Sequence, residues 1–272
     1  MAFCMIIPFY WMIATSLKTA AEIDLPTPTL IPGLGKYDLA LSNYPEAITR
    51  LNAGRLIFNT IVVGVFSTIG TVVTTVMAAF AFSRIKFFGR EIIFTLFLAT
   101  MMIPGEMMVI TNYITVTKTA KTIFGTSGID TYWAMIVPFL ISVYYIYLLR
   151  QNFKQIPNEL YLAAKVDGKS DWKFLWRVMV PLAAPTLISI TILKFMGTWN
   201  SYVWPNLVTN SDDFRLISNG LRGSSFTDAD IGKTSYGYQM AATVLVTVPL
   251  FLLFVFFRKY IMRGVGRAGI KG

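Results

Sequence analysis

The feature that most constrains this chain is a run of 28 residues, 56–83, without a charged side chain. A helix of that length can cross the hydrocarbon core of a bilayer with some tilt. Five further stretches are similarly apolar, and of the 272 residues 55% are hydrophobic whereas only 14% are charged. A soluble domain seldom has this balance. The pattern therefore predicts an all-α polytopic membrane protein.

Six spans divide the chain into an N-terminal part (1–54), a core (55–258) and a C-terminal tail (259–272). The first span has only 17 residues and lacks the basic residues that usually precede a first helix, so either the true start lies upstream or the helix is short and tilted. It does not resemble a signal peptide, because it has no charged leading region. The six predicted spans are 1–17, 56–83, 92–117, 132–149, 182–204 (beginning as early as 178) and 236–257.

The distribution of basic residues predicts the orientation of these spans. Residues 84–91, 150–177 and 258–272 alternate along the chain with the other connections, and they hold 14 of its 24 Lys and Arg residues. The remaining connections balance their basic residues with acidic ones. Because cytoplasmic loops carry the excess of Lys and Arg, both termini and the 150–177 segment are expected in the cytoplasm. The net charge of +10 thus indicates membrane topology and not nucleic acid.

The residue inventory excludes several kinds of chemistry. Cys4 is the single cysteine, so the chain has no disulfide framework and no cysteine-based metal site. The chain has no histidine, which removes the commonest general base and metal ligand. A transporter subunit or a membrane scaffold is favoured over a membrane enzyme.

Residues 150–181 form the one polar stretch that such a chain does not need in order to cross a bilayer. Pro157 suits the first position of a helix, and Asp167-Gly168 suits its end, because glycine readily takes the left-handed conformation. Ser170 can cap a second helix. Four apolar residues of that second helix are spaced to lie on one face: Trp172, Leu175, Trp176 and Met179. The stretch is therefore predicted to be a hairpin of two short helices presented to a partner.

The core of this hairpin resembles the coupling signature of ABC importer permeases. Residues 162–168 read Leu-Ala-Ala-Lys-Val-Asp-Gly, and a Val-Pro pair ends at Pro181, thirteen residues past the glycine. The family signature has Glu-Ala-Ala, then Asp-Gly, then a hydrophobic stretch ending in Leu-Pro or Val-Pro. Four further segments resemble the maltose-type second permease of the carbohydrate-importer branch: 131–153, 156–160, 188–205 and 269–272. The resemblance covers nearly the whole chain.

The resemblance implies a type I ABC importer permease fold whose hairpin, residues 157–181, docks in a cleft of a separate ATPase subunit. The residues it assigns to this coupling are Leu162, Ala163, Ala164, Asp167, Gly168 and Pro181. Leu162 stands where the family has glutamate, so apolar contact is expected there in place of an ionic one. Small alanines let another surface approach closely, and Gly168 permits the sharp turn. The bland alternative is a helix that simply ends in a turn.

The resemblance also implies partners. A sister permease would complete a heterodimer, and an extracellular solute-binding protein would deliver solute to loops 18–54 and 205–235. ATP and Mg²⁺ would be held by the ATPase, with no cofactor in this chain; the sequence has no G-x-x-x-x-G-K-[ST] phosphate loop. The basic tail 259–272 suits either the ATPase or anionic membrane lipid. A bacterial plasma membrane is the implied location.

Candidate pathway residues lie inside the spans. Glu106 and Lys194 are the only charges in their inner parts, at similar depth, so a pair facing the interior is one hypothesis. The alternative is that Glu106 satisfies backbone freed at Pro104-Gly105 while Lys194 extends outward.

Aromatic and amide side chains are further candidates for the pathway, because they suit a sugar. These are Asn112, Tyr113, Trp199 and Asn200. The alternative for the aromatic side chains is an interfacial belt, which is favoured for Trp204. In the maltose importer the sister permease holds most of the sugar, so few contacts are expected from this chain.

The sequence leaves the solute open. A carbohydrate is the leading prediction, and glycerol phosphate or a related polyol is the alternative within the same family. An ion-coupled secondary transporter would need several buried ionisable groups, and only Glu106 and Lys194 are available.

Overall fold

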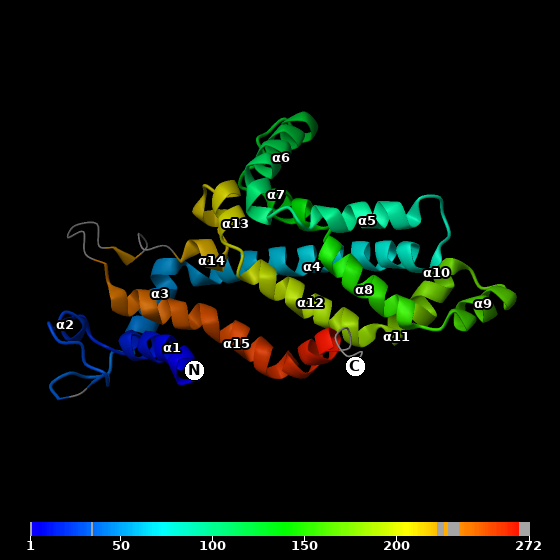
Figure 1. Ribbon diagram of the computed structural model, residues 1–272. Coiled ribbons are helices and arrows are strands. Elements are labelled where there is room, and N and C mark those ends of the chain that lie inside the picture. Colours follow the sequence, from blue (N-terminus) through cyan, green and yellow to red (C-terminus); the bar gives the residue numbers. More distant parts are fainter. Residues whose placement is uncertain (1, 34, 222–225, 228–233, 267–272) are drawn as a thin grey trace. The chain divides into compact units, whose positions relative to one another are not determined.

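A computed structural model describes residues 2–33, 35–221, 226–227 and 234–266, with side chains described between residues 4 and 260 (Figure 1). Apart from one isolated bridge between Thr227 and Thr234, these residues form helices, turns and loops. The predicted all-helical architecture is confirmed for this part of the chain. The chain divides into two compact units, residues 1–61 with 201–255 and residues 62–200 with 256–272.

Two of the described helices are long and apolar enough to cross a membrane unaided, α4 (Ala53–Arg84) and α15 (Tyr236–Gly266). Three more candidate spans are pairs of helices that meet at a bend, which brings the number to as many as five by length and composition. Helix α1 (Ala2–Ser16) has 15 residues and contains Pro8. It is shorter than a standard span.

The first bend lies where the sequence predicts it, at Pro104-Gly105. Helix α5 (Arg90–Thr100) meets η1 (Gly105–Met108) and α6 (Val109–Phe124) at 91°. Proline disfavours helical geometry in the residue before it, and this ends the regular path of the chain. The expected polar turn at 118–130 is wrong in its first half, because α6 continues to Phe124 and Gly125 ends it with a φ of 71°.

The second and third bends were not predicted. Helices α7 (Tyr132–Ile136) and η2 (Val137–Phe139) meet α8 (Val143–Gln155) at 44°. The segment of α10 (Asp171–Phe174), η3 (Leu175–Met179) and α11 (Val180–Leu182) meets α12 (Ala184–Trp199) at 79°. Prolines lie at or beside each break, and a proline contributes no backbone N–H to a helix.

Close packing in the second unit depends on small and hydroxyl-bearing residues of α4. A Cβ on Gly64 would lie 2.7 Å from the Phe195 ring of α12, so glycine allows this approach. Thr71 donates to the carbonyl of Phe139 (3.0 Å) and Thr74 to that of Leu140 (2.6 Å). These carbonyls lie at the break before α8. Small residues and interhelical hydrogen bonds of this kind are typical of helix packing in membranes.

The first unit is held together by buried polar side chains. Asn43, at the start of α3 (Asn43–Leu51), donates to the carbonyls of Ser16 and Lys18 at 2.9 Å each. Glu22 of α2 (Ala20–Ile23) is 1% exposed and accepts from Thr29 at 2.6 Å. The segment predicted as a loop, 18–54, therefore contains two helices and closes on itself. The first unit also contains three short elements from later in the chain: α13 (Val203–Val208), η4 (Asp212–Phe214) and α14 (Ile217–Gly220).

Candidate coupling site

The hairpin between α8 and α12 begins with α9 (Asn158–Val166). Gly168 takes a φ of 69°, and the Lys169 amide donates back to Ala164 at 2.9 Å, which closes the end of the helix. Ser170 accepts a hydrogen bond from the Lys173 amide at 3.4 Å and caps α10. The predicted helix end and cap are both confirmed, because each is decided by residues within one turn.

The two arms of the hairpin are joined by one carboxylate. Asp171 accepts from the Tyr161 hydroxyl at 2.8 Å and from the Lys165 ammonium at 2.8 Å. The hydrogen bond that the Lys165 ammonium donates to Asp171 raises the pKa of Lys165. Burial, and then the bond to Asp171, raise the pKa of Tyr161. The Tyr161 ring also packs edge-on against Phe174, with centroids 5.2 Å apart.

The prediction that one apolar face runs along the second arm is wrong. Leu175 and Met179 are buried at 1% and 0%, whereas Trp172 and Trp176 are 57% and 39% exposed. Residues 175–179 form a π-helical segment, whose wider turn shifts the faces relative to an α-helix. The two indoles instead pack against each other, with centroids 5.6 Å apart.

The structure separates the signature residues into two groups. Ala164 is 6% exposed and packs into the core of its own chain, beside Phe153 and Phe174. Ala163 and Leu162 face outward, and Leu162 is 55% exposed. Close approach by another protein is therefore open to Ala163 and not to Ala164. The outward residues also include Leu160, Val166, Asp167, Gly168 and Pro181.

Arg84, the last residue of α4, is bound to the base of the hairpin. Its side chain donates to the carbonyls of Phe153 (2.9 Å) and Ile156 (2.5 Å) and to the Asn158 side chain (3.1 Å). It is 9% exposed. The guanidinium thus supplies a partner to the Ile156 carbonyl at the end of α8, and a second partner to the Phe153 carbonyl, which also accepts from the Ile156 amide at 3.2 Å.

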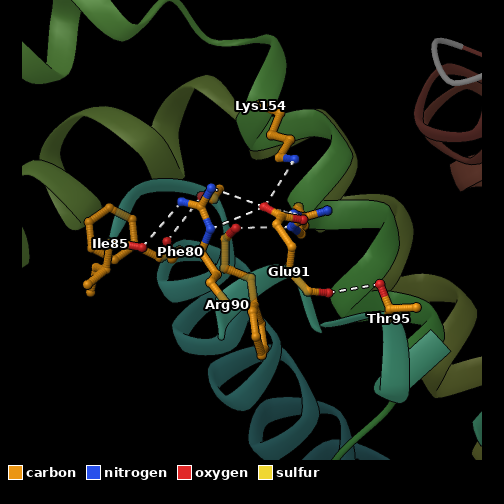
Figure 2. Close-up of polar contacts among 9 residues, drawn as sticks. Phe80, Ile85, Arg90, Glu91, Thr95 and Lys154 are labelled. Carbon is orange, nitrogen blue, oxygen red and sulfur yellow. Dashed lines mark hydrogen bonds and ion pairs between the residues drawn. The ribbon is translucent and has the colours of Figure 1, made fainter. Parts of the chain in front are cut away.

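Arg150 reaches in the opposite direction, from α8 to the backbone of α4. It donates to the Phe82 carbonyl of α4 at 3.0 Å and to both Glu91 oxygens at 2.9 and 2.7 Å. Its guanidinium carbon also lies 3.8 Å from the centroid of the Phe94 ring. Figure 2 shows Glu91 contacted also by Arg90 and Lys154. An Arg90 nitrogen lies 3.0 Å and the Lys154 nitrogen 4.0 Å from a Glu91 carboxylate oxygen.

The sequence predicted no specific role for Arg84, Glu91 or Arg150. In the sequence, their charges indicate only which side of the membrane each connection is expected to face. A signal was present in the positions of the two arginines, since each lies at the edge of an apolar run where the side chain can reach a neighbouring helix end.

Glu106 and Lys194 do not form an ion pair in the described structure. Lys194 donates to the Phe139 carbonyl at 3.2 Å, at the break before α8, and so occupies one of the acceptors that the bend releases. Glu106 is exposed in η1. The paired hypothesis is therefore wrong for this conformation. Lys194 neither pairs with Glu106 nor extends outward to the membrane surface. Its ammonium instead bonds to a backbone carbonyl of the same chain.

The other pathway candidates have different environments. Asn112 and Tyr113 are half-buried on α6, and Asn200 is exposed after the end of α12. Trp199 is 5% exposed beside Phe195, with ring centroids 6.0 Å apart, and its indole N–H has no hydrogen-bond partner among the described groups. Among the described residues, no three His, Cys, Asp or Glu side chains could hold a metal ion together.

Comparison with known families gives one family match. Residues 70–267 match the model of the "Binding-protein-dependent transport system inner membrane component". The sn-glycerol-3-phosphate transport system permease protein UgpE of Rhizobium meliloti is 30% identical, over 96% of this chain and 90% of that protein. The arabinooligosaccharides transport system permease protein AraQ of Bacillus subtilis is 28% identical, over 97% and 90%. The diacetylchitobiose uptake system permease protein NgcG of Streptomyces coelicolor is 27% identical, over 96% and 83%.

A solved structure supports the fold. One chain of a bacterial ABC transporter involved in the import of the acidic polysaccharide alginate superposes with a TM-score of 0.80. The match covers 95% of this chain and 91% of that one, at 22% identity. A second structure of the alginate transporter, with a pentasaccharide-bound periplasmic protein, gives a TM-score of 0.56.

Proposed function

Because the chain belongs to the binding-protein-dependent inner membrane components of ABC transporters, as a non-catalytic permease subunit, we propose that its hairpin couples solute import to a separate ATPase. The observation that carries this is the outward apolar surface on α9. Leu162 and Val166 lie one turn apart and are 55% and 89% exposed, whereas Ala164 on the opposite side of the helix is buried; Leu160 is also 44% exposed. Exposed apolar residues on one short, capped element outside the spans suit a protein partner.

The proposed topology has six spans, with α1 and the five further candidates, and both termini on the side of the hairpin. The excess of Lys and Arg in residues 84–91, 150–177 and 258–272 supports the cytoplasmic assignment of that side. A sister permease would pack against part of the apolar surface of the spans. A periplasmic binding protein would deliver solute on the side of the membrane opposite the hairpin. The alginate transporter structure includes such a periplasmic protein.

For the solute, we propose a small oligosaccharide or disaccharide. Two of the relatives are named for oligosaccharide uptake, AraQ and NgcG. Trp199 is 5% exposed, so its unpartnered indole N–H would meet a sugar hydroxyl only in a conformation that uncovers it.

Glycerol-3-phosphate is the second candidate. The UgpE relatives favour it, and Lys194 supplies a positive charge within α12 that a phosphate ester would need.

The decisive experiment is co-expression with candidate ATPase and sister-permease subunits from the same genome, followed by purification and reconstitution in vesicles. Copurification of the ATPase, and ATP hydrolysis stimulated by a candidate binding protein, are the expected results. Uptake of a labelled disaccharide is then compared with uptake of labelled glycerol-3-phosphate. A chain that purifies without any ATPase, or that takes up solute under an ion gradient alone, would contradict the proposal.

A matched pair of variants tests the docking surface. Leu162→Asp should weaken copurification of the ATPase, because it places a charge in an apolar contact. Leu39 is similarly exposed, at 53%, in the segment before α3, so Leu39→Asp serves as the control and should leave copurification unchanged.

A further inference from the structure

The hairpin has a joint at its base. Between α8 and α9, Ile156 and Pro157 are extended, with ψ angles of 128° and 139°. Pro157 has no backbone N–H, so no helical hydrogen bond continues through it. Without other restraints, α9 could pivot at this joint independently of α8 and the spans.

Arg84 bridges the joint from outside. Two of its acceptors precede Pro157 in the chain: the Arg84 guanidinium donates to the carbonyls of Phe153 and Ile156 at 2.9 and 2.5 Å. The third acceptor follows Pro157: the same guanidinium donates to the Asn158 side chain at 3.1 Å. One planar guanidinium therefore holds both sides of the joint to the end of α4, and its fork fixes the angle between them.

Arg150 completes the link in the opposite direction. It extends from α8 to the Phe82 carbonyl, two residues before Arg84, at 3.0 Å. Its two bonds to Glu91 add the start of α5. Each helix thus donates an arginine to the backbone of the other. We name this pair, Arg84 and Arg150, the arginine clasp.

Arg84 and Arg150 are buried, at 9% and 3% exposure of the whole residue, and the Arg84 Nε–H has no hydrogen-bond partner among the described groups. Burying a charge is unfavourable unless its donors find partners, and apolar side chains of similar size would often pack at least as well. Stability alone therefore gives weak reason for two buried arginines at one helix junction. What arginine adds over an apolar side chain is directional bonding to several backbone groups at once.

We infer that the arginine clasp is the rigid link through which movement of the coupling hairpin reaches α4 and α5, so that Arg84 and Arg150 are positioning residues of the transport cycle. This inference rests on the proposed function. With the clasp closed, rotation of α9 on its partner turns the ends of α4, α5 and α8 together. With it open, α9 stays attached through the apolar packing of Ala164 with Phe153 and Phe174, which does not fix the angle at Ile156-Pro157, so its rotation no longer turns the ends of α4 and α5.

The test uses the reconstituted complex of this chain with its ATPase and sister permease. Hydrogen exchange is measured by mass spectrometry before and after trapping with ATP, Mg²⁺ and orthovanadate. In the wild type, trapping should change exchange both in α9 and in the turn 82–91. In Arg84→Ala the change in α9 should persist, while the change in residues 82–91 should fall by roughly tenfold, to background.

Lys86→Ala is the matched control, since it removes a positive charge from the same turn. Lys86 is exposed and makes no such bond within the described structure. Arg84→Lys should recover only part of the response, because an ammonium cannot reproduce the planar fork. Asn158→Ala removes a single bond on the far side of the joint, so it should lower the response while assembly remains normal.

An unchanged response of residues 82–91 in Arg84→Ala, or an equal loss in Lys86→Ala, would overturn the inference. If Arg84→Ala fails to assemble, Asn158→Ala decides: a wild-type response there assigns the clasp to folding alone and refutes transmission. A wild-type chain that never binds the ATPase would instead refute the proposed function, and this is seen before any variant is made.

Discussion

The ion pair between Arg150 and Glu91 allows the energetics of the clasp to be measured by a double-mutant cycle. Arg150→Met keeps the apolar stem of the side chain and removes its charge. Glu91→Gln keeps the shape of its partner and removes the opposite charge. The four proteins of the cycle isolate the coupling of the two groups from everything else that each one touches.

The expected magnitudes follow from the contacts. Hydrogen bonds to charged groups contribute about 1.5–3 kcal/mol each. The Glu91 side chain is 58% exposed, so solvent screening reduces its share, and we expect a coupling energy of about 1–2 kcal/mol. Arg150→Met also leaves the Phe82 carbonyl without this donor and removes the contact with the Phe94 ring. Its total cost should therefore reach about 3–5 kcal/mol.

The assay is reversible unfolding of the purified chain in mixed detergent micelles, followed by tryptophan fluorescence. The pair Arg50–Glu46 on α3 is the control, because its N–O distance is also 2.7 Å but its arginine is 33% exposed. Surface pairs of this kind couple by about 0.3–0.5 kcal/mol. Additivity of Arg150→Met and Glu91→Gln within about 0.5 kcal/mol, or coupling no stronger than in the control cycle, would refute the reasoning.

Three further predictions concern the hairpin and the pathway. Ala164→Leu should lower the free energy of unfolding by about 1–3 kcal/mol, because the site is already filled, whereas Ala163→Leu should leave unfolding unchanged and reduce ATPase copurification. Gly168→Pro should abolish uptake while membrane insertion survives, because proline cannot take the φ of 69° found there, and Gly168→Ala, with open space around the new Cβ, should be milder; normal uptake by Gly168→Pro would contradict this. Lys194→Gln should reduce uptake of glycerol-3-phosphate at least about tenfold if that is the solute, and leave disaccharide uptake unchanged, as measured with labelled solutes in vesicles.

Local features such as helix ends, caps and breaks could be predicted from the sequence, because short-range chemistry decides them. The φ of Gly168, the cap from Ser170 and the break at Pro104-Gly105 each depend on residues within one turn. The exposed position of Leu162 is likewise consistent with the apolar contact expected from its departure from the family signature. The docking itself stays a prediction.

The features that could not be predicted depend on tertiary contacts. The carbonyls of Phe139 and Leu140, at the bend before α8, accept from Thr71, Thr74 and Lys194, and these donors lie more than fifty residues away in the chain. The faces of the second arm depend on the π-helical turn at 175–179, which shifts the i, i+3, i+4 pattern. Contacts between helices also depend on how the helices pack. The similar depth of Glu106 and Lys194 in two helices was therefore not enough to predict a contact between their side chains.

The turn between α4 and α5 shows how a count of charges passes over differences in their surroundings. Arg84, Lys86 and Arg90 contribute equally to the positive-inside pattern, which is a property of composition. Their surroundings differ: Arg84 is buried against α8 and α9, Lys86 is exposed, and Arg90 bonds to Glu91. A topological role is met by any cation at these positions, lysine included. Only a guanidinium held against several carbonyls also fixes the angle between two helices, so the substitution Arg84→Lys separates the two roles: it keeps the orientation of the spans and weakens the link to the hairpin.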